Sequence, residues 1–501
     1  MKNNNKPLIL NPEYKLRHDD DKVLLIVKDL NEVKKYGAEE EYTGLIHPIH
    51  AMMLSFFNGK TFDETITEIH NYFGIEKNII KKTFEKLVCN DEFIKIDFSN
   101  TLIYFPRNVI IPMTEEMTKH DYEPEMFKYN KVNLKFRRLN APLDLTINFT
   151  SRCMTDCIYC YADRREKVDC TIPLERIYEL IDEAKELDLR SIDVIGGEFF
   201  LYKHWHEVLA KLRQNGFTPY LTTKIAIKED VIKKTKNLGF TSIQISLDTM
   251  RKENLLKSVQ IKEKYFYNMQ NTFELLEKYD LKVQINTILS SATDSVDDIK
   301  SLEKFFSKFK NIITWRINYG EYSMYLGEEA FRNYKASKVN VSKINKYIKK
   351  INSKNIFEFK IEEVGIEGNV NYLSVKEKKD SFEKRATCTG NLYAMYILPD
   401  GKVTICEELY WNEHFIIGDV TKQSIKEVWD SEKARDLFFL TQDRISEDSV
   451  CKTSESFDEC RGGNPKQICW RDTIKAYGHN KWDYPDYRCP LAPTVEKEIF
   501  A

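Results

Sequence analysis

The 501-residue sequence lacks a long hydrophobic run. No apolar stretch approaches the roughly 20 residues that a helix needs to cross a bilayer. The opening stretch, MKNNNKPLILNPEYK, has no extended apolar segment of the kind that secretory signal peptides carry. We therefore expect a cytoplasmic protein without a membrane partner.

An excess of basic residues is also missing. Lysine and arginine number 76 against 78 aspartates and glutamates, which gives a net charge of -2 at pH 7. Without a global positive field, the charge balance does not favour a nucleic-acid partner. The length predicts about three domains, and a hydrophobic content of 42% is enough to fill substantial cores.

Cysteine, in contrast, is plentiful and clustered. In a reducing compartment, 11 cysteines are better explained by metal or cluster ligation than by disulfides. Nine of them fall into two groups along the chain. The first group is Cys153, Cys157 and Cys160, and the second is Cys388, Cys406, Cys451, Cys460, Cys469 and Cys489.

The first group forms a CxxxCxxC loop directly after the β-rich run at 143-149. Three thiolates on one loop can ligate a single metal centre, but they leave it one ligand short of a closed zinc or iron-sulfur site. Either a distant residue supplies the fourth ligand, or one metal position stays open for a substrate or cofactor. Tyr159 adds a flat apolar face on which a planar heterocycle could rest. For the loop alone, a zinc site is the alternative.

This loop, with an aromatic residue before its last cysteine, resembles the cluster loop of the radical S-adenosylmethionine (SAM) enzymes. The resemblance implies that Cys153, Cys157 and Cys160 hold a 4Fe-4S cluster whose open iron chelates SAM. It also implies that an electron donor such as flavodoxin or ferredoxin drives the cleavage of SAM to a 5'-deoxyadenosyl radical. That radical would abstract a hydrogen atom from the substrate.

Residues 142-320 alternate between strand and helix patterns. The alternation predicts an α/β domain of parallel βαβ units that close partway into a (β/α)6 barrel. Ligand sites in such sheets lie at the carboxyl ends of the strands, where the cysteine loop begins. The expected strands are 143-149, 191-195, 218-223, 242-247, 282-289 and 312-318, and the expected helices are 173-188, 202-214, 229-237, 258-278 and 296-308.

Polar motifs follow several of these strands. Gly196-Gly197-Glu198 comes after the second strand and Ser246-Leu247-Asp248 after the fourth. In the resembled family, the first motif holds the amino group of SAM, and the second supports its ribose and carboxylate. The SAM site implied in this way, with one amide from the fifth strand, is Tyr159, Gly196, Gly197, Glu198, Ser246, Asp248 and Asn286. Four further polar residues fit a ligand role and a barrel interior equally well: Thr222, Thr223, Arg316 and Asn318. No catalytic residue is identified.

Residues 1-111 predict a small module that precedes the barrel. Two strands within 14-30 surround an Asp-rich turn, and three helical patterns and a short strand follow, at 45-57, 61-73, 77-89 and 93-96. The module resembles the winged-helix-like peptide-recognition element of natural-product maturases, which implies that a leader peptide adds as a strand to its sheet. A DNA-binding winged helix and a structural cap are the alternatives, although the segment has no dense Lys/Arg helix. Residues 112-141 are expected to be a linker.

The second cysteine group lies in residues 381-501, after a connecting helical region at 321-380. A strand, a Pro-Asp-Gly turn and a strand that ends in Cys406 predict a hairpin. The pattern of cysteines, hairpin and later Cys460-Arg461-Gly462-Gly463 resembles the SPASM domain, which binds auxiliary 4Fe-4S clusters. Six cysteines can fill one closed cluster with two left over, or two clusters with three each. We favour two auxiliary clusters.

Together these resemblances imply an enzyme that modifies a ribosomally synthesised precursor peptide. Thioether crosslinking of cysteine, as in sactipeptide and ranthipeptide maturases, is the preferred reaction. Carbon-carbon crosslinking and formylglycine formation of the sulfatase-maturase type are the enzymatic alternatives. A zinc-stabilised regulator that binds DNA is the non-enzymatic one.

Overall fold

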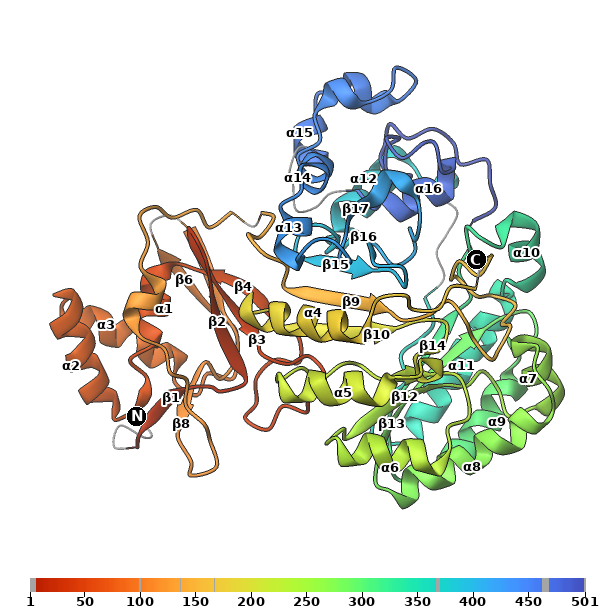
Figure 1. Ribbon diagram of the computed structural model, residues 1–501, viewed down its shortest axis with the longest axis horizontal. Helices are drawn as coiled ribbons and strands as arrows, with labels where there is room; N and C mark the ends of the chain where they lie inside the picture. The colour runs from red at the N-terminus through yellow and green to blue at the C-terminus, as the bar shows by residue number, and fades with distance from the viewer. Residues whose placement is uncertain are drawn as a thin grey trace. The chain divides into compact units, whose positions relative to one another are not determined.

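The fold is described from a computed structural model over residues 6-98, 101-135, 137-165, 167-365, 370-461 and 468-499. The chain divides into two compact units, Met1–Leu143 and Asp144–Ala501, coloured red to orange and yellow to blue in Figure 1. Each unit has a hydrophobic core of its own. Among the described residues, no helix combines the length and the apolar character that a membrane span requires.

The first unit contains an antiparallel sheet of β2 (Tyr14–Asp19), β3 (Lys22–Val27) and β4 (Thr43–Ile46), in the order β2-β3-β4. The two predicted strands within 14-30 are therefore confirmed. Asp20 stands in their turn with a φ of 52°, a left-handed conformation that Asp tolerates better than most residues. Every residue of β3 is buried, which makes this strand the centre of the unit's core.

The three predicted helices of this unit correspond to α1 (Pro48–Leu54), α2 (Phe62–Phe73) and α3 (Lys77–Phe84). Thr61 caps α2 as expected. The first helix begins later than predicted, because residues 43-46 pair with β3 as an edge strand. The remaining strands are β1 (Leu8–Leu10), β5 (Asn58–Lys60) and β8 (Ile110–Pro112), which form a second sheet, and β6 (Ile94–Phe98) and β7 (Thr101–Phe105), which form a hairpin.

The second unit begins with alternating strands and helices, as predicted. All neighbouring strands of this part pair in parallel, in the groups β10-β9 and β11-β12-β13-β14. The elements are β9 (Asp144–Asn148), α4 (Leu174–Glu186), β10 (Ser191–Ile195), α5 (Trp205–Gln214), β11 (Thr222–Thr223), α6 (Glu229–Asn237), β12 (Ser242–Ser246), α7 (Lys252–Val259), α8 (Lys264–Lys278), β13 (Lys282–Leu289), α9 (Val296–Phe306) and β14 (Ile312–Tyr319).

One predicted helix of this series is wrong. Residues 258-278 contain the end of α7 and the whole of α8. The break lies at Gln260, whose backbone is left-handed and therefore ends the first helix.

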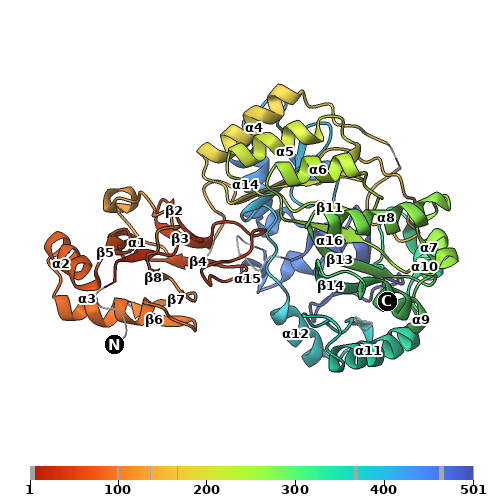
Figure 2. The same ribbon diagram turned by 90° about the horizontal axis from the view of Figure 1, so that it is seen from below.

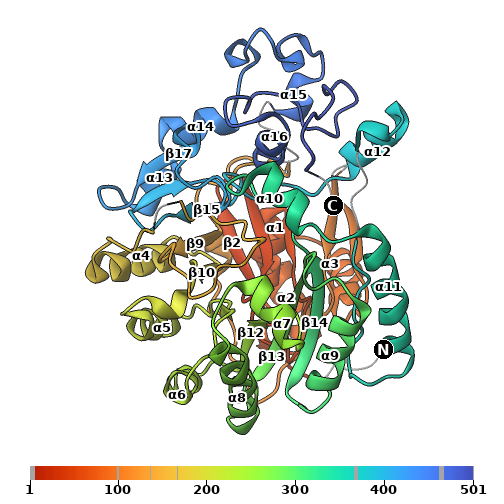
Figure 3. The ribbon, with the colours of Figure 1, turned by 90° about the vertical axis from the view of Figure 1, so that its right-hand side faces the viewer.

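The helices lie on the outside of the parallel strands. In Figure 3, α4, α5, α6, α8 and α9 follow one another along an arc, and Figure 2 shows β13 and β14 inside α8 and α9. Along β13, buried Val283 and Ile285 alternate with partly exposed Gln284 and Asn286. One face of the sheet therefore packs in the core, and the other carries polar side chains that can meet a ligand.

A hairpin from the C-terminal part of the chain extends the first parallel group. β15 (Ala394–Ile397) pairs in parallel with β9, and β16 (Lys402–Thr404) and β17 (Ile416–Asp419) continue the sheet. The predicted turn is present, with Gly401 at a φ of 88°. The remaining helices are α10 (Gly327–Tyr334), α11 (Lys338–Ser353), α12 (Val375–Lys384), α13 (Ile425–Trp429), α14 (Glu432–Phe438), α15 (Phe457–Cys460) and α16 (Trp470–Tyr477).

Candidate functional site

The cysteine loop leaves the C-terminal end of β9, as the sequence predicts. Cys157 is buried, whereas Cys153 and Cys160 are partly exposed, and all three carry free thiols. The hydroxyl of Thr155 lies 3.2 Å from the sulfur of Cys153 and 3.5 Å from the sulfur of Cys157. At least two of the three thiols therefore meet around one small side chain.

The paired glycines after β10 pack directly against this loop. The backbone N–H of Gly197 donates to the carbonyl of Thr150 at 2.6 Å. A Cβ at Gly196 would lie 2.8 Å from the same carbonyl oxygen. A Cβ at Gly197 would lie 2.8 Å from the carbonyl oxygen of Ser151 and closer still to that of Arg152. Only glycine permits this approach, so the structure brings two of the predicted motifs together.

Asp248, after β12, has a fully buried carboxylate with several protein donors. One oxygen accepts from Lys224 Nζ at 2.9 Å and from the backbone N–H of Ile288 at 3.3 Å. The other accepts from the hydroxyl of Tyr159 and from that of Ser258 at 3.0 Å. Asp248 therefore connects the cysteine loop to the strands. Its role in supporting SAM stays a prediction.

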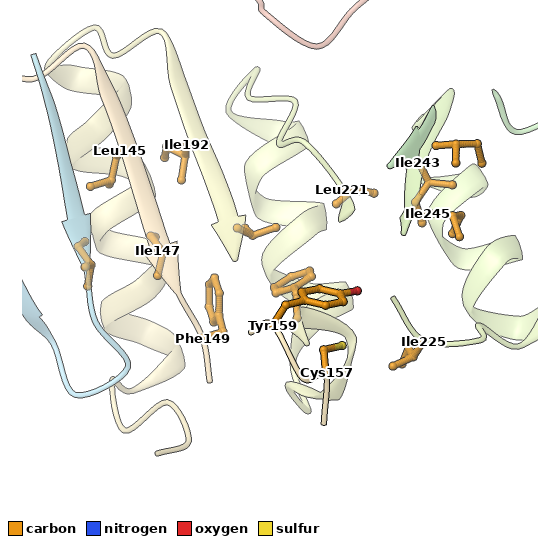
Figure 4. Packing of buried hydrophobic residues seen from close by; sticks show 14 of the residues in the cluster. Leu145, Ile147, Phe149, Cys157, Tyr159, Ile192, Leu221, Ile225, Ile243 and Ile245 are labelled. Carbon is orange, nitrogen blue, oxygen red and sulfur yellow. The ribbon is translucent and has the colours of Figure 1, made fainter. Parts of the chain in front are cut away.

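Tyr159 lies beside Cys157 in the core (Figure 4). Its phenol oxygen points away from Phe149, toward the side of the barrel that carries Ile243 and Ile245. Burial raises the pKa of this phenol well above its ordinary value, and Asp248 adds to the rise. The hydroxyl therefore stays protonated and acts as a hydrogen-bond donor.

The carboxylate of Glu198 faces the third strand. It accepts from the hydroxyl of Thr223 at 2.7 Å and from the backbone N–H of Phe200 at 3.2 Å. Burial raises its pKa to about 7, while the hydrogen bond from Thr223 lowers it. Glu198 therefore connects the segment that follows the paired glycines to β11, and its predicted contact with SAM stays a prediction.

Ser246 and Asn286 lie side by side on neighbouring strands, and Arg316 continues the row on β14. The hydroxyl of Ser246 accepts from the amide of Gln244 at 2.9 Å, and the carbonyl of Asn286 accepts from the amide of Asn318 at 3.1 Å. This row belongs to the polar face of the sheet. The structure thus places these predicted residues along one rim.

The six later cysteines separate into two sets by their electrostatic neighbours. Burial raises the pKa of Cys406 to about 12, and Cys388 adds to the rise. Cys388 also raises the pKa of Cys469, after burial and Asp472. In the other set, Cys451 raises the pKa values of Cys460 and Cys489, in each case after burial. The sets are Cys388, Cys406 and Cys469, and Cys451, Cys460 and Cys489.

Comparisons with known proteins agree with this geometry. The radical SAM superfamily is matched by residues 147-306, and the iron-sulfur cluster-binding SPASM domain is matched by residues 388-460. The chain contains a radical SAM domain followed by a SPASM domain. The radical SAM and SPASM resemblances of the sequence are thereby confirmed, and they favour an enzyme over a zinc-stabilised regulator.

Curated relatives match part of the chain. Over 171 residues the chain is 26% identical to GTP 3',8-cyclase of Helicobacter pylori, and the match covers 32% of this chain and 50% of that protein. The enzyme of the same name from Clostridium botulinum is 25% identical over 170 residues, with 32% and 52% covered. The chain therefore spans about half the length of these curated relatives.

One solved structure shares the fold along almost the whole chain. The crystal structure of Streptococcus suis SuiB bound to precursor peptide SuiA has a TM-score of 0.61 at 14% identity, and the match covers 97% of this chain and 100% of that one. SuiB bound to S-adenosylmethionine gives the same TM-score at 15% identity, with 96% and 100% covered. The mixed α/β fold with its partial barrel is confirmed.

The residues of these two domains fit the cofactors that the domains indicate, 4Fe-4S clusters and SAM. Thiols are the ligands of iron-sulfur clusters, and Gly196 and Gly197 bring the turn after β10 directly against the loop that carries these thiols. Within the described part of the chain, no three His, Cys, Asp or Glu side chains are grouped to hold a single metal ion. A cluster places each thiolate on a different iron, so its ligands need not converge on one point.

Lys224 is the residue of this site that sequence reasoning missed. It directly follows Thr222 and Thr223, and its side chain is largely buried against Asp248. A lysine directly after a barrel strand was the available signal. Gly462 and Gly463, which the SPASM resemblance includes, lie outside the described residues.

Proposed function

We propose that this radical SAM enzyme modifies a ribosomally synthesised precursor peptide, with thioether crosslinking of cysteine as its reaction. The observation that carries the proposal is the likeness in fold to SuiB, which extends over 97% of the chain and therefore includes the first unit. SuiB was solved with its precursor peptide, whereas the curated GTP cyclases match only about a third of this chain.

The proposed cluster ligands in the barrel are Cys153, Cys157 and Cys160. When bound there, the cluster supplies the electron that cleaves SAM to a hydrogen-abstracting 5'-deoxyadenosyl radical. Gly196 and Gly197 would hold their turn against the cysteine loop, and the backbone of this turn would bind the amino group of SAM, as the family resemblance implies. The polar row of Ser246 and Asn286 would bind the remainder of SAM.

We assign two auxiliary clusters to the SPASM domain. Their ligands are Cys388, Cys406 and Cys469 for one, and Cys451, Cys460 and Cys489 for the other. Each set contains three thiols, so each cluster would have a fourth position for another ligand, such as a substrate thiolate. A flavodoxin or ferredoxin is the proposed electron donor.

The first unit would bind the leader of the precursor peptide. The sheet of β2, β3 and β4 ends on one side in β4, where Thr43, Gly44 and Leu45 are only partly buried. An extended peptide can add as a further strand to such an edge through backbone hydrogen bonds. A unit with its own core offers a rigid surface for this binding.

The test is co-expression of the chain with short cysteine-containing open reading frames from its own genome. A thioether removes two hydrogen atoms from the peptide, and the loss persists after treatment with a thiol reductant, whereas a disulfide regains them. Cys157→Ala is the inactive control. Conversion of GTP without any change in a peptide would reject the proposal in favour of nucleotide chemistry, and formylglycine would identify the sulfatase-type alternative.

A further inference from the structure

A buried ion pair lies beside the cysteine loop. Lys224 Nζ is 2.9 Å from Asp248, and the two side chains are 15% and 0% exposed. Removing both charges from water is costly, and their attraction alone does not always offset that cost. Lys224 and Asp248 follow neighbouring strands, β11 and β12, at the carboxyl edge of the sheet.

The pair is connected to the loop through Tyr159. Asp248 accepts a hydrogen bond from the phenol, and Lys224 Nζ lies 5.5 Å from the centroid of the same ring. Tyr159 stands between Cys157 and Cys160 in the sequence. The hydroxyl of Tyr265 also donates to the carbonyl of Lys224 at 2.6 Å, which holds this lysine's backbone in place.

Two backbone hydrogen bonds fasten the loop on its other side. The N–H of Asp156 donates to the carbonyl of Val259 at 2.9 Å, and the N–H of Ile158 donates to the carbonyl of Ser258 at 3.0 Å. Ser258 in turn donates its hydroxyl to Asp248. Ser258 therefore contacts both the cysteine loop and the ion pair.

Both charges of the pair therefore lie close to the cysteine loop. Asp248 is hydrogen-bonded to Tyr159, the residue directly before Cys160, and the ammonium of Lys224 lies beside the same ring.

We propose that Lys224 and Asp248 are positioning residues that set the reduction potential of the cluster on Cys153, Cys157 and Cys160. Adding one electron makes the cluster more negative. The nearby ammonium stabilises that electron and raises the potential, whereas the carboxylate opposes it and lowers the potential. This inference rests on the proposed placement of that cluster.

Three variants of the full chain test the inference: Lys224→Met, Asp248→Asn and the double variant. The midpoint potential is followed through the EPR signal that changes when SAM is added, because this response separates the barrel cluster from the auxiliary ones. We expect a more negative potential for Lys224→Met and a more positive one for Asp248→Asn. The double variant, which removes both charges, should lie between them.

The opposite signs distinguish a charge effect from a structural one. The inference is wrong if both single variants shift the midpoint potential in the same direction. It is also wrong if the potential of the double variant lies outside the range set by the two single variants. Lys228→Met, an exposed lysine four residues further on, is the matched control and should leave the potential unchanged.

Iron content and spin quantitation show which variants retain the cluster. Should Lys224→Met fail to assemble it, Asp248→Asn alone still decides, because an unchanged or more negative potential there contradicts the inference. A wild-type chain without any SAM-responsive cluster would instead reject the placement of the cluster on the three cysteines.

Discussion

At the scale of single residues, the site contains residues whose close contacts leave no room for a larger or differently charged side chain. Gly197 touches the backbone of the cysteine loop, and Asp248 has protein donors at both carboxylate oxygens. Backbone atoms cannot move aside in the way that a flexible side chain can. Small substitutions here should therefore have large effects.

Gly197→Ala should displace the cysteine loop. The added methyl group would overlap the carbonyl of Arg152, and overpacking of this kind destabilises by about 1-3 kcal/mol. We expect a lower midpoint in urea unfolding and at least a tenfold loss of 5'-deoxyadenosine formation from SAM. Gly365→Ala is the control, since no atom of the described residues lies within 4 Å of its Cβ position. Equal behaviour of the two variants would contradict the described packing.

Glu198 should make stability depend on pH. Its folded pKa of about 7 lies above the ordinary value of 4.5, so the folded chain holds a proton there that the unfolded chain has released. This contribution is fully present below about pH 4.5 and is lost as the pH rises through about 7. Its size is on the order of 3 kcal/mol.

Glu198→Gln replaces the carboxyl group with an amide that does not titrate, so the variant lacks this pH-dependent contribution to stability. The difference in unfolding free energy between pH 5 and pH 8, measured in urea, should be smaller for the variant than for the wild type. Other groups titrate in both proteins, so the pH-dependent change of the variant is subtracted from that of the wild type to isolate the contribution of Glu198. Parallel pH profiles would show that Glu198 is ionised throughout.

At the scale of elements, some helices and strands are specified by nearby residues in the chain, and others depend on pairing with a distant segment. Helix α2 begins where its sequence specifies, because Thr61 and Glu64 form a capping box. Strand β15 is different, since it is completed only by pairing with β9, about 250 residues earlier in the chain. Local elements can be tested with local substitutions.

Thr61→Ala should destabilise the first unit by about 1 kcal/mol, because it removes the hydroxyl that caps α2. Thr67→Ala, inside the same helix, is the matched control and should be neutral or slightly stabilising, since alanine is the better helix former. Urea unfolding followed by circular dichroism measures both. Iron content should stay unchanged in each, because neither residue belongs to the second unit.

At the scale of the whole molecule, two units have separate cores, and the second carries every proposed cluster ligand. Three sets of three cysteines lie in this second unit. If each set holds one 4Fe-4S cluster, the anaerobically reconstituted chain should contain about 12 iron atoms.

The division of the six later cysteines predicts how iron is lost. Cys406→Ala and Cys451→Ala should each remove about four iron atoms, and the two together about eight. Cys406→Ala combined with Cys469→Ala should remove no more than Cys406→Ala alone, because both belong to one set. Iron and sulfide analysis gives the numbers. A loss of about eight atoms from that pair would contradict the division.

The sequence by itself determined the features that depend on neighbours in the chain. The spacing of Cys153, Cys157 and Cys160, the glycine pair, the Pro-Asp-Gly turn and the alternation of strands and helices are all local patterns. They were sufficient for the family, the fold class and the cofactors. The long helix at 258-278 was the local pattern that misled, since nothing in its periodicity shows the left-handed Gln260.

Only the tertiary structure decided what depends on residues far apart in the chain. It paired β15 with β9 and directed Glu198 toward Thr223. It also placed Lys224 against Asp248 beside the cysteine loop. The physical reason is that burial and the position of a charge depend on packing across strands, and no spacing along the sequence specifies them.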